Sequence, residues 1–523
     1  MNRENPYIAR VQRVLGKLKL AQKRGLSCYG SDMHEFRLRA PISEAEVQSF
    51  ENEHRVHLPE DYRTFLIWGG NGGAGPYNGI FPLQEWEDFA DWVHDDRPDN
   101  FLALPCPLNR GMCRESDWRG QFGDVSPYQG TLSLGSRGCT YATQLVVSGN
   151  CAGRVVYVDA GGSEPPYIIR EPDFLAWYER WLDELLQGYE GNWFGYGPGG
   201  GAEDFLRILD DSNADDELKS EAAIAFCRLP QLPDEMTPHI RALLDSPIDG
   251  VRVGAVATAA KFEIKTVVGK ITELLHDPHA PVREEAITAL ARLDPWGWAD
   301  AVRPLLHDRD QDVARRAFYR LNDTQSLQKS ELLQLVEASP AHSLRALAVA
   351  ALQWEKNDVP LLLCLLRDEE SYIRRSAISG LQSLQNRDAL PHFLELLSRE
   401  TDVYNVGAIL KIFGEWLEPS TAPALLEWSQ CADDFNRLEA MTALAKIGDI
   451  RCVPLAQAML REKQPPVRRD ANGFTSQTHV KPMDELVREV LLQSPNLTLH
   501  ELALSSQHPA LPLPDHKNHS HGN

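Results

Sequence analysis

The chain has 523 residues, of which 43% are hydrophobic and 24% are charged, and its formal net charge is −22 at pH 7. This composition is typical of a soluble globular protein with two or more domains. The excess of 75 acidic over 53 basic side chains excludes a general nucleic-acid-binding protein, which must offset phosphate charge, and favours a basic protein partner.

The N-terminal residues predict a basic amphipathic helix. Ile8, Val11, Leu15 and Leu18 form an apolar stripe, and basic side chains lie around it. Such a helix could bind a membrane surface, direct the chain to an organelle, or pack against its own domain. Of these alternatives we favour packing.

Residues 1–187 predict an α+β domain. Ser43 and Glu46 form a capping box, and Leu58-Pro59-Glu60-Asp61 starts a second helix. The buried face of this second helix is expected to comprise Tyr62, Phe65, Leu66 and Trp68. Strands are predicted at 131–134, 144–147 and 154–159, and a last helix at 172–186. Helices followed by a small antiparallel sheet and one more helix are typical of this fold class.

One predicted surface element is rich in acidic side chains. Residues 84–99 read QEWEDFADWVHDDRPD, and a helix there would bury Trp86 and place Trp92 on the opposite face. A tryptophan ringed by carboxylates suits the anchor of a basic partner. The alternative is a solvated helix whose Trp92 packs under the glycine loop. The candidate partner-binding residues are Trp92, Glu85, Asp88, Asp95 and Asp96.

Half of residues 188–201, GYEGNWFGYGPGGG, are glycine, which predicts a flexible linker.

From residue 202 to 480 the sequence repeats every 29 to 33 residues. Each repeat carries an apolar anchor, usually with a small residue four positions later, and a second apolar helix lies between anchors. The anchors are Leu218, Val251, Val282, Val313, Leu344, Ile373, Val403, Phe435 and Val467. Repeated helix pairs with small contact residues predict an all-α superhelix, or right-handed solenoid.

Several anchors are followed directly by an arginine, as at Arg252, Arg283, Arg345, Arg374 and Arg468. These arginines are expected to form a ladder between repeats with the Asp that closes the previous helix.

Residues 481–504 predict a C-terminal helical cap, and residues 505–523 a disordered tail with too little apolar content to pack.

Two resemblances follow from these motifs. Glu-Val-x-x-Phe-Glu, Leu-Pro-Glu-Asp-Tyr and Asn-Gly-Gly, which lie between residues 46 and 73, make residues 27–187 similar to the SUKH superfamily. That family includes fungal cell-wall-assembly regulators and bacterial immunity proteins, and it implies a non-enzymatic protein-binding domain. Segments such as SYIRRSAISGL and APVREEAITALARL resemble HEAT-like repeats of the phycobilisome-lyase type over residues 202–470.

The sequence contains motifs that resemble those of enzymes, but their surroundings do not suit a catalytic or cofactor-binding role. Gly70–Gly75 fits G-x-G-x-x-G, but it follows a helix instead of a strand, so a dinucleotide site is not expected. The His-Glu pairs of diiron HEAT-like hydroxylases are absent from the repeats, since His34-Glu35 and His500-Glu501 lie outside them. The nine cysteines include no Cys-x-x-Cys pair. We therefore expect no catalytic residue, cofactor or metal, and a cytoplasmic protein with reduced thiols and no membrane span.

The leading functional hypothesis is a non-enzymatic protein that neutralises a bacterial toxin by surface complementarity. A regulatory scaffold without a toxin partner is the first alternative. An enzyme such as a bilin-lyase-like protein is the second, and it rests on the type of repeat alone.

Overall fold

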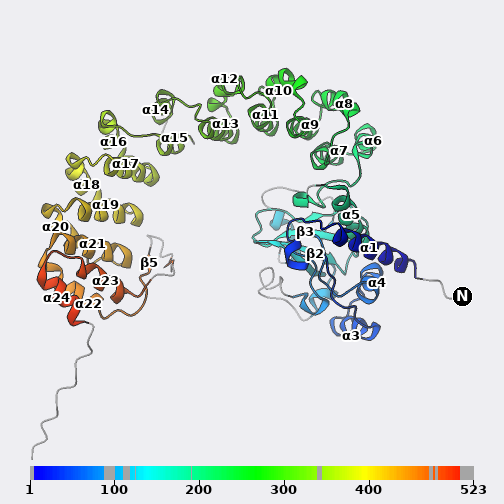
Figure 1. Ribbon diagram of the computed structural model, residues 1–523, viewed down its shortest axis with the longest axis horizontal. Helices are drawn as coiled ribbons and strands as arrows, with labels where there is room; N and C mark the ends of the chain where they lie inside the picture. The colour runs from blue at the N-terminus through cyan, green and yellow to red at the C-terminus, as the bar shows by residue number, and fades with distance from the viewer. Residues whose placement is uncertain are drawn as a thin grey trace, which may run out of the picture. The chain divides into compact units, whose positions relative to one another are not determined.

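The computed structural model describes residues 5–87, 100–109, 118–123, 125–189, 191–337, 344–469, 475–476 and 481–506. The chain forms two compact units, Met1–Leu321 and Asn322–Asn523. The first contains an α+β domain and the first helical repeats, and the second contains further helical repeats (Figure 1). None of the helices in the described ranges combines the length and apolar character needed to cross a bilayer.

The α+β domain begins with helix α1 (Pro6–Lys23), which starts at Pro6 behind an Asn5 cap. Its buried side chains are Val11, Val14, Leu18 and Ala21. The helix packs on α5 (Phe174–Gln187), and Arg10 pairs with Asp173 at 2.7 Å. The basic helix therefore packs on its own domain.

Three short helices follow. They are α2 (Ser31–His34), α3 (Glu44–His54) and α4 (Glu60–Trp68). The Ser43–Glu46 capping box at the start of α3 is confirmed. Tyr62, Phe65 and Leu66 are buried as predicted, but Trp68 is exposed because it ends the helix at the surface.

The sheet is antiparallel with strand order β1-β2-β3-β4. Its strands are β1 (Thr131–Gly138), β2 (Tyr141–Val146), β3 (Val155–Asp159) and β4 (Tyr167–Ile168). The three predicted strands are confirmed, and β4 is an additional two-residue edge. Aromatic side chains of α5, among them Phe174, Trp177 and Tyr178, are buried in the same core as β1, β2 and β3.

From residue 202 on, most of the described chain consists of helix pairs. In the first unit they are α6 (Ala202–Asp210), α7 (Asp216–Ala225), α8 (Thr237–Leu243), α9 (Asp249–Lys261), α10 (Val268–Leu274), α11 (Ala280–Leu293), α12 (Trp298–Val302) and α13 (Gln311–Asp323), whose last two residues belong to the second unit. Gly254 of α9, which precedes the predicted small residue Ala255, permits close approach of α7, because a Cβ there would lie 2.5 Å from the backbone of Ala223.

The second unit continues the pattern and ends in two helices after a short strand pair. Its elements are α14 (Lys329–Glu337), α15 (Arg345–Ala351), α16 (Val359–Leu365), α17 (Ser371–Ser383), α18 (Leu390–Leu397), α19 (Val403–Trp416), α20 (Ala422–Trp428), α21 (Asp434–Ile447), α22 (Val453–Met459), β5 (Arg468–Arg469), β6 (Thr475–Ser476), α23 (Met483–Leu492) and α24 (Leu497–Ser505). The domain bounds expected from the sequence, including the cap at 481–504, stay predictions, and the tail from residue 507 lies outside the described residues.

An arginine–carboxylate ladder connects successive repeats, with one correction to the expectation. The carboxylate comes from the end of the first helix of the next repeat, and the turn that precedes the arginine's own helix offers backbone carbonyls. Arg283, for example, pairs with Asp308 at 2.7 Å and donates to the Asp277 carbonyl at 2.8 Å. Arg468 lies instead in β5. The pairs are Arg252–Asp277, Arg283–Asp308, Arg345–Asp368, Arg374–Glu400 and Arg437–Glu462.

We expect Arg283→Ala to lower the free energy of unfolding of the first unit by about 3–5 kcal/mol, because it leaves Asp308 buried without its cation. Arg316→Ala is the matched control. Arg316 also joins successive repeats, through Glu284 at 3.3 Å, but at the surface, so its loss should cost less than about 1 kcal/mol. Urea unfolding followed by circular dichroism measures both, and equal losses would contradict the structural role of the ladder.

The ladder also predicts acid sensitivity at Glu400. Burial raises the pKa of Glu400, but hydrogen bonds from Arg374, the Asp402 backbone and Asn405 outweigh burial and lower it to about 2. Its ordinary value is 4.5, so its ionisation stabilises the fold above that pH, and this contribution is lost as the pH falls toward 2. The difference in unfolding free energy between wild type and Glu400→Gln should therefore shrink from pH 6 to pH 2. The exposed Glu427→Gln should show no such trend in the same urea titrations.

Candidate functional site

The acidic surface predicted at residues 84–99 is described only in part. Glu85 ends a 3-10 helix (Leu83–Glu85) and pairs with Arg39 at 3.1 Å. Trp86 is buried, as predicted, against Phe50 and His54. Asp88, Trp92, Asp95 and Asp96 lie outside the described residues, so this surface stays a prediction.

The glycine-rich segment 188–201 differs from the flexible linker expected, because it is packed against the α+β domain. Phe194 is buried, and its carbonyl accepts hydrogen bonds from the hydroxyls of Tyr77 and Tyr157 at 2.8 and 3.1 Å. Gly195 has a φ of +86°, and a Cβ there would lie 2.3 Å from the Tyr157 hydroxyl oxygen. Glycine at this position therefore serves close approach and a left-handed backbone.

A buried cluster of charges lies beside this segment. Glu184 of α5 accepts hydrogen bonds from Arg180, one turn earlier, and from Arg228, which follows α7. Arg180 also pairs with Glu171 at 2.7 Å and donates to the Gly197 carbonyl at 2.9 Å. Burial lowers the pKa of Arg180, but Glu184 and Glu171 raise it above its ordinary value, so the Arg180 side chain stays positively charged. This cluster joins the last helix of the α+β domain, the segment and the first repeat.

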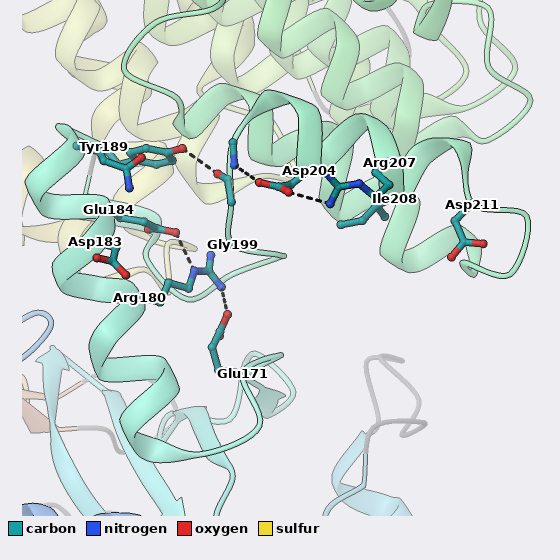
Figure 2. Close-up of a pocket in the computed structure, with 13 residues that line it drawn as sticks. Glu171, Arg180, Asp183, Glu184, Tyr189, Gly199, Asp204, Arg207, Ile208 and Asp211 are labelled. Carbon is teal, nitrogen blue, oxygen red and sulfur yellow. Dashed lines mark hydrogen bonds and ion pairs between the residues drawn. The ribbon is translucent and has the colours of Figure 1, made fainter. Parts of the chain in front are cut away.

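One cleft, of about 760 Å³, opens between α5, the glycine-rich segment and α6 (Figure 2). Its acidic side chains already have partners. Asp183 pairs with Lys17 at 2.6 Å, and Asp204 accepts from the Gly201 backbone at 2.9 Å and from Arg207 at 3.0 Å. Figure 2 shows Arg180 lying between Glu184 and Glu171, with an interaction drawn to each. The carboxylates here hold the local structure together.

The same segment lines a second cleft of about 960 Å³, which we call the aromatic cleft. The strands β1 to β3, the Pro165-Pro166 turn and β4 supply one wall, and α7, α9 and α11 supply the other. Trp193 and Ile224 line it with 67% and 47% of their surfaces exposed. The volume and the predominance of aromatic and apolar walls match those of ligand-binding pockets.

Arg137 occupies one side of the aromatic cleft inside a group of tyrosines. Its guanidinium carbon lies 3.9 Å from the ring centre of Tyr157, and three further tyrosine rings lie within 6 Å. These further rings are Tyr77 at 4.7 Å, Tyr196 at 5.2 Å and Tyr141 at 5.8 Å. Cation–π contacts of this kind stabilise a guanidinium that is shielded from water.

Both clefts are lined by charged side chains, and the aromatic cleft also by aromatic rings. Neither lining includes a histidine. Burial raises the pKa of Tyr167 to about 12 and that of Tyr157 well above its ordinary value, so both stay protonated near neutral pH. Among the described residues, no three His, Cys, Asp or Glu side chains are grouped so as to hold a metal ion. Aromatic faces and fixed charges are what the aromatic cleft offers to a ligand.

Sequence reasoning missed the aromatic cleft, although one signal was present. A flexible linker has no use for large apolar side chains, yet residues 193–196 read Trp-Phe-Gly-Tyr. Aromatics in a glycine-rich segment indicate that it packs against something. The other wall, with Ile224 and Lys261, lies in repeats whose exposed faces the periodicity does not distinguish.

Comparisons with known proteins agree with this division of the chain. The model of the SMI1/KNR4 family (SUKH-1) matches residues 41–180, and the model of HEAT repeats matches residues 268–353 and 329–409. No curated protein matches the chain.

Several solved structures are also similar to the chain. The Escherichia coli protein YibA is 17% identical, covers 48% of this chain and 93% of its own, and has a TM-score of 0.35. The CpcE–CpcF complex of phycocyanin lyase from Nostoc is 18% identical with coverages of 50% and 96% and a TM-score of 0.19. Human deoxyhypusine hydroxylase is 18% identical with coverages of 58% and 94% and a TM-score of 0.20.

The geometry and the family models together show that this chain carries an N-terminal SMI1/KNR4 (SUKH-1) domain fused to HEAT repeats.

Proposed function

We propose that this chain is a non-enzymatic protein-binding protein whose partner docks in the aromatic cleft, and that the partner is a bacterial toxin which it neutralises. The SUKH-1 domain and the HEAT repeats support a protein-interaction role. The observation that carries the proposal is the exposure of Trp193 and Ile224 in a cleft lined by both modules.

Exposed tryptophan is the strongest feature of this cleft. Leaving a large apolar side chain in water is unfavourable, and tryptophan is enriched among the residues that dominate binding energy at protein interfaces. Trp193 is held in place by the packed glycine-rich segment and lies 6.0 Å from Tyr196, ring centre to ring centre. A partner side chain entering the cleft would therefore meet a preformed aromatic wall and would lose little entropy in ordering it.

Charge adds the second element of the proposal. The net charge of −22 would steer a basic protein toward this chain and speed association at low salt. Toxin domains that act on nucleic acids are basic in order to offset phosphate charge, so an acidic protein is well suited to occlude them. A protein that neutralises a toxin by covering its active surface needs to bind the toxin and needs no catalytic activity of its own.

The immunity proposal predicts the behaviour of cells that carry a toxin. The gene for this chain should neighbour one that encodes a secreted protein with a toxic C-terminal domain. Expressing that domain should stop bacterial growth, and co-expressing the full chain should restore it, measured as colony counts over a dilution series. A gene neighbourhood without such a protein in any relative, or growth arrest that the chain does not relieve, would contradict immunity.

The binding site is tested separately with the same toxic domain. Trp193→Ala should weaken its binding to the full chain at least tenfold, because the aromatic anchor is lost, as measured by biolayer interferometry. Trp296→Ala is the matched control, since Trp296 is 95% exposed in the first unit but does not line the cleft. Equal affinities for the two variants would remove the aromatic cleft from the interface.

A further inference from the structure

Arg137 differs from the buried arginines of the described chain in the way its charge is balanced. Each of the buried arginines, which are Arg180, Arg228, Arg252 and Arg283, pairs with a carboxylate. Arg137 has no carboxylate partner among the described residues. Its Nη2 donates to the hydroxyls of Tyr196 and Tyr77 at 3.1 and 3.4 Å, and its Nε and Nη1 have no hydrogen-bond partner.

Three carboxylates line the same cleft, and each contacts a group other than Arg137. Glu164 is exposed and accepts from the Tyr141 hydroxyl at 3.5 Å. Asp159 accepts from the Thr140 hydroxyl at 2.6 Å and from backbone amides of the turn that follows β3, at Gly161 and Ser163. Glu221 pairs with Arg170 and accepts from the Tyr167 hydroxyl at 3.1 Å. Among the described residues, the charge of Arg137 is therefore balanced by ring quadrupoles and hydroxyl dipoles and not by a carboxylate.

An unbalanced cation that is shielded from water attracts an anion strongly. The effective dielectric constant near such a group is far below that of water, so a carboxylate that enters the cleft gains more there than at an exposed arginine. The opposite wall adds to this attraction, because Arg292 of α11 lines the cleft with its side chain 55% exposed and its nearest carboxylate, Glu263, at 3.8 Å. The cleft thus offers a positive site beside an apolar wall.

We infer that the aromatic cleft recognises a carboxylate-bearing segment of the partner protein, with the carboxylate paired to Arg137 and neighbouring apolar or proline residues packed on Trp193 and Ile224. This inference rests on the proposed function and specifies the chemical group of the partner that the cleft binds. A basic partner is compatible with it, because net charge steers the whole molecule whereas the cleft contacts only a few residues. The carboxylate can belong to an Asp or Glu side chain or to a chain terminus.

A peptide library tests the inference without the partner. Random 12-residue peptides displayed on phage are selected on the full chain, with the Trp193→Ala variant used to remove peptides that bind elsewhere. We expect the selected peptides to be enriched in Asp or Glu next to proline, aromatic or aliphatic residues. Synthetic copies with the acid replaced by Asn or Gln should bind the wild-type chain at least tenfold more weakly. Comparing amidated with free-acid peptides separates a side-chain carboxylate from a terminal one.

Variants of the chain complete the test. Arg137→Gln should lower the affinity for the acidic peptide tenfold and leave the affinity for its Asn copy unchanged, and a thermal unfolding curve checks that the variant folds. Replacing the acid in the peptide needs no variant, so the result stands even if Arg137→Gln is unstable. Selected peptides without acidic enrichment, equal binding of the Asp and Asn copies, or a library that yields no binder would each overturn the inference. The proposed function fails differently, by toxin binding that Trp193→Ala does not change.

Discussion

The ion pairs among Arg180, Glu184 and Arg228 are the interaction on which the site depends. Glu184 belongs to the last helix of the SUKH-1 domain, and Arg228 belongs to the first repeat, so their pairing fixes the two modules to each other at that point. The pairing is buried, and breaking one partner of a buried pair leaves an uncompensated charge. Both walls of the aromatic cleft are positioned by this cluster and by the segment that runs past it.

The same physical device recurs along the repeats. An arginine near the start of the second helix of a repeat donates to carbonyls of its own turn and pairs with the acid that closes the first helix of the next repeat. Arg283 and Arg374 thereby satisfy carbonyls of the turn before their own helix and fix the spacing between neighbouring repeats. The repeat anchored by Val313 has Ala314 in place of the arginine, and the chain divides into its two compact units within that repeat's helix, after Leu321.

Sequence patterns predicted what local chemistry determines. The Ser43–Glu46 box, the three longer strands and the periodic helices depend on residues close in the chain, and the structure confirms them. The packing of residues 188–201 could not be predicted in this way, because Phe194 contacts Tyr77 and Tyr157, which lie 117 and 37 residues away. Glycine content alone cannot distinguish a flexible segment from one that packs closely. At Gly195 the close approach of Tyr157 leaves no room for a side chain. The direction of the arginine ladder was missed for the same reason, since it depends on how repeats stack.

Neither module alone accounts for the aromatic cleft. The SUKH-1 match ends at residue 180 and the HEAT match begins at 268, whereas Trp193, Ile224 and Lys261 fall between them. The sheet contributes Arg137 and its tyrosines, but a sheet without the opposite wall would expose them to water, where the charge of Arg137 would be screened. The apolar wall without Arg137 would bind apolar ligands without a preference for a negatively charged group. The carboxylate recognition that we propose therefore requires both modules and the residues that join them.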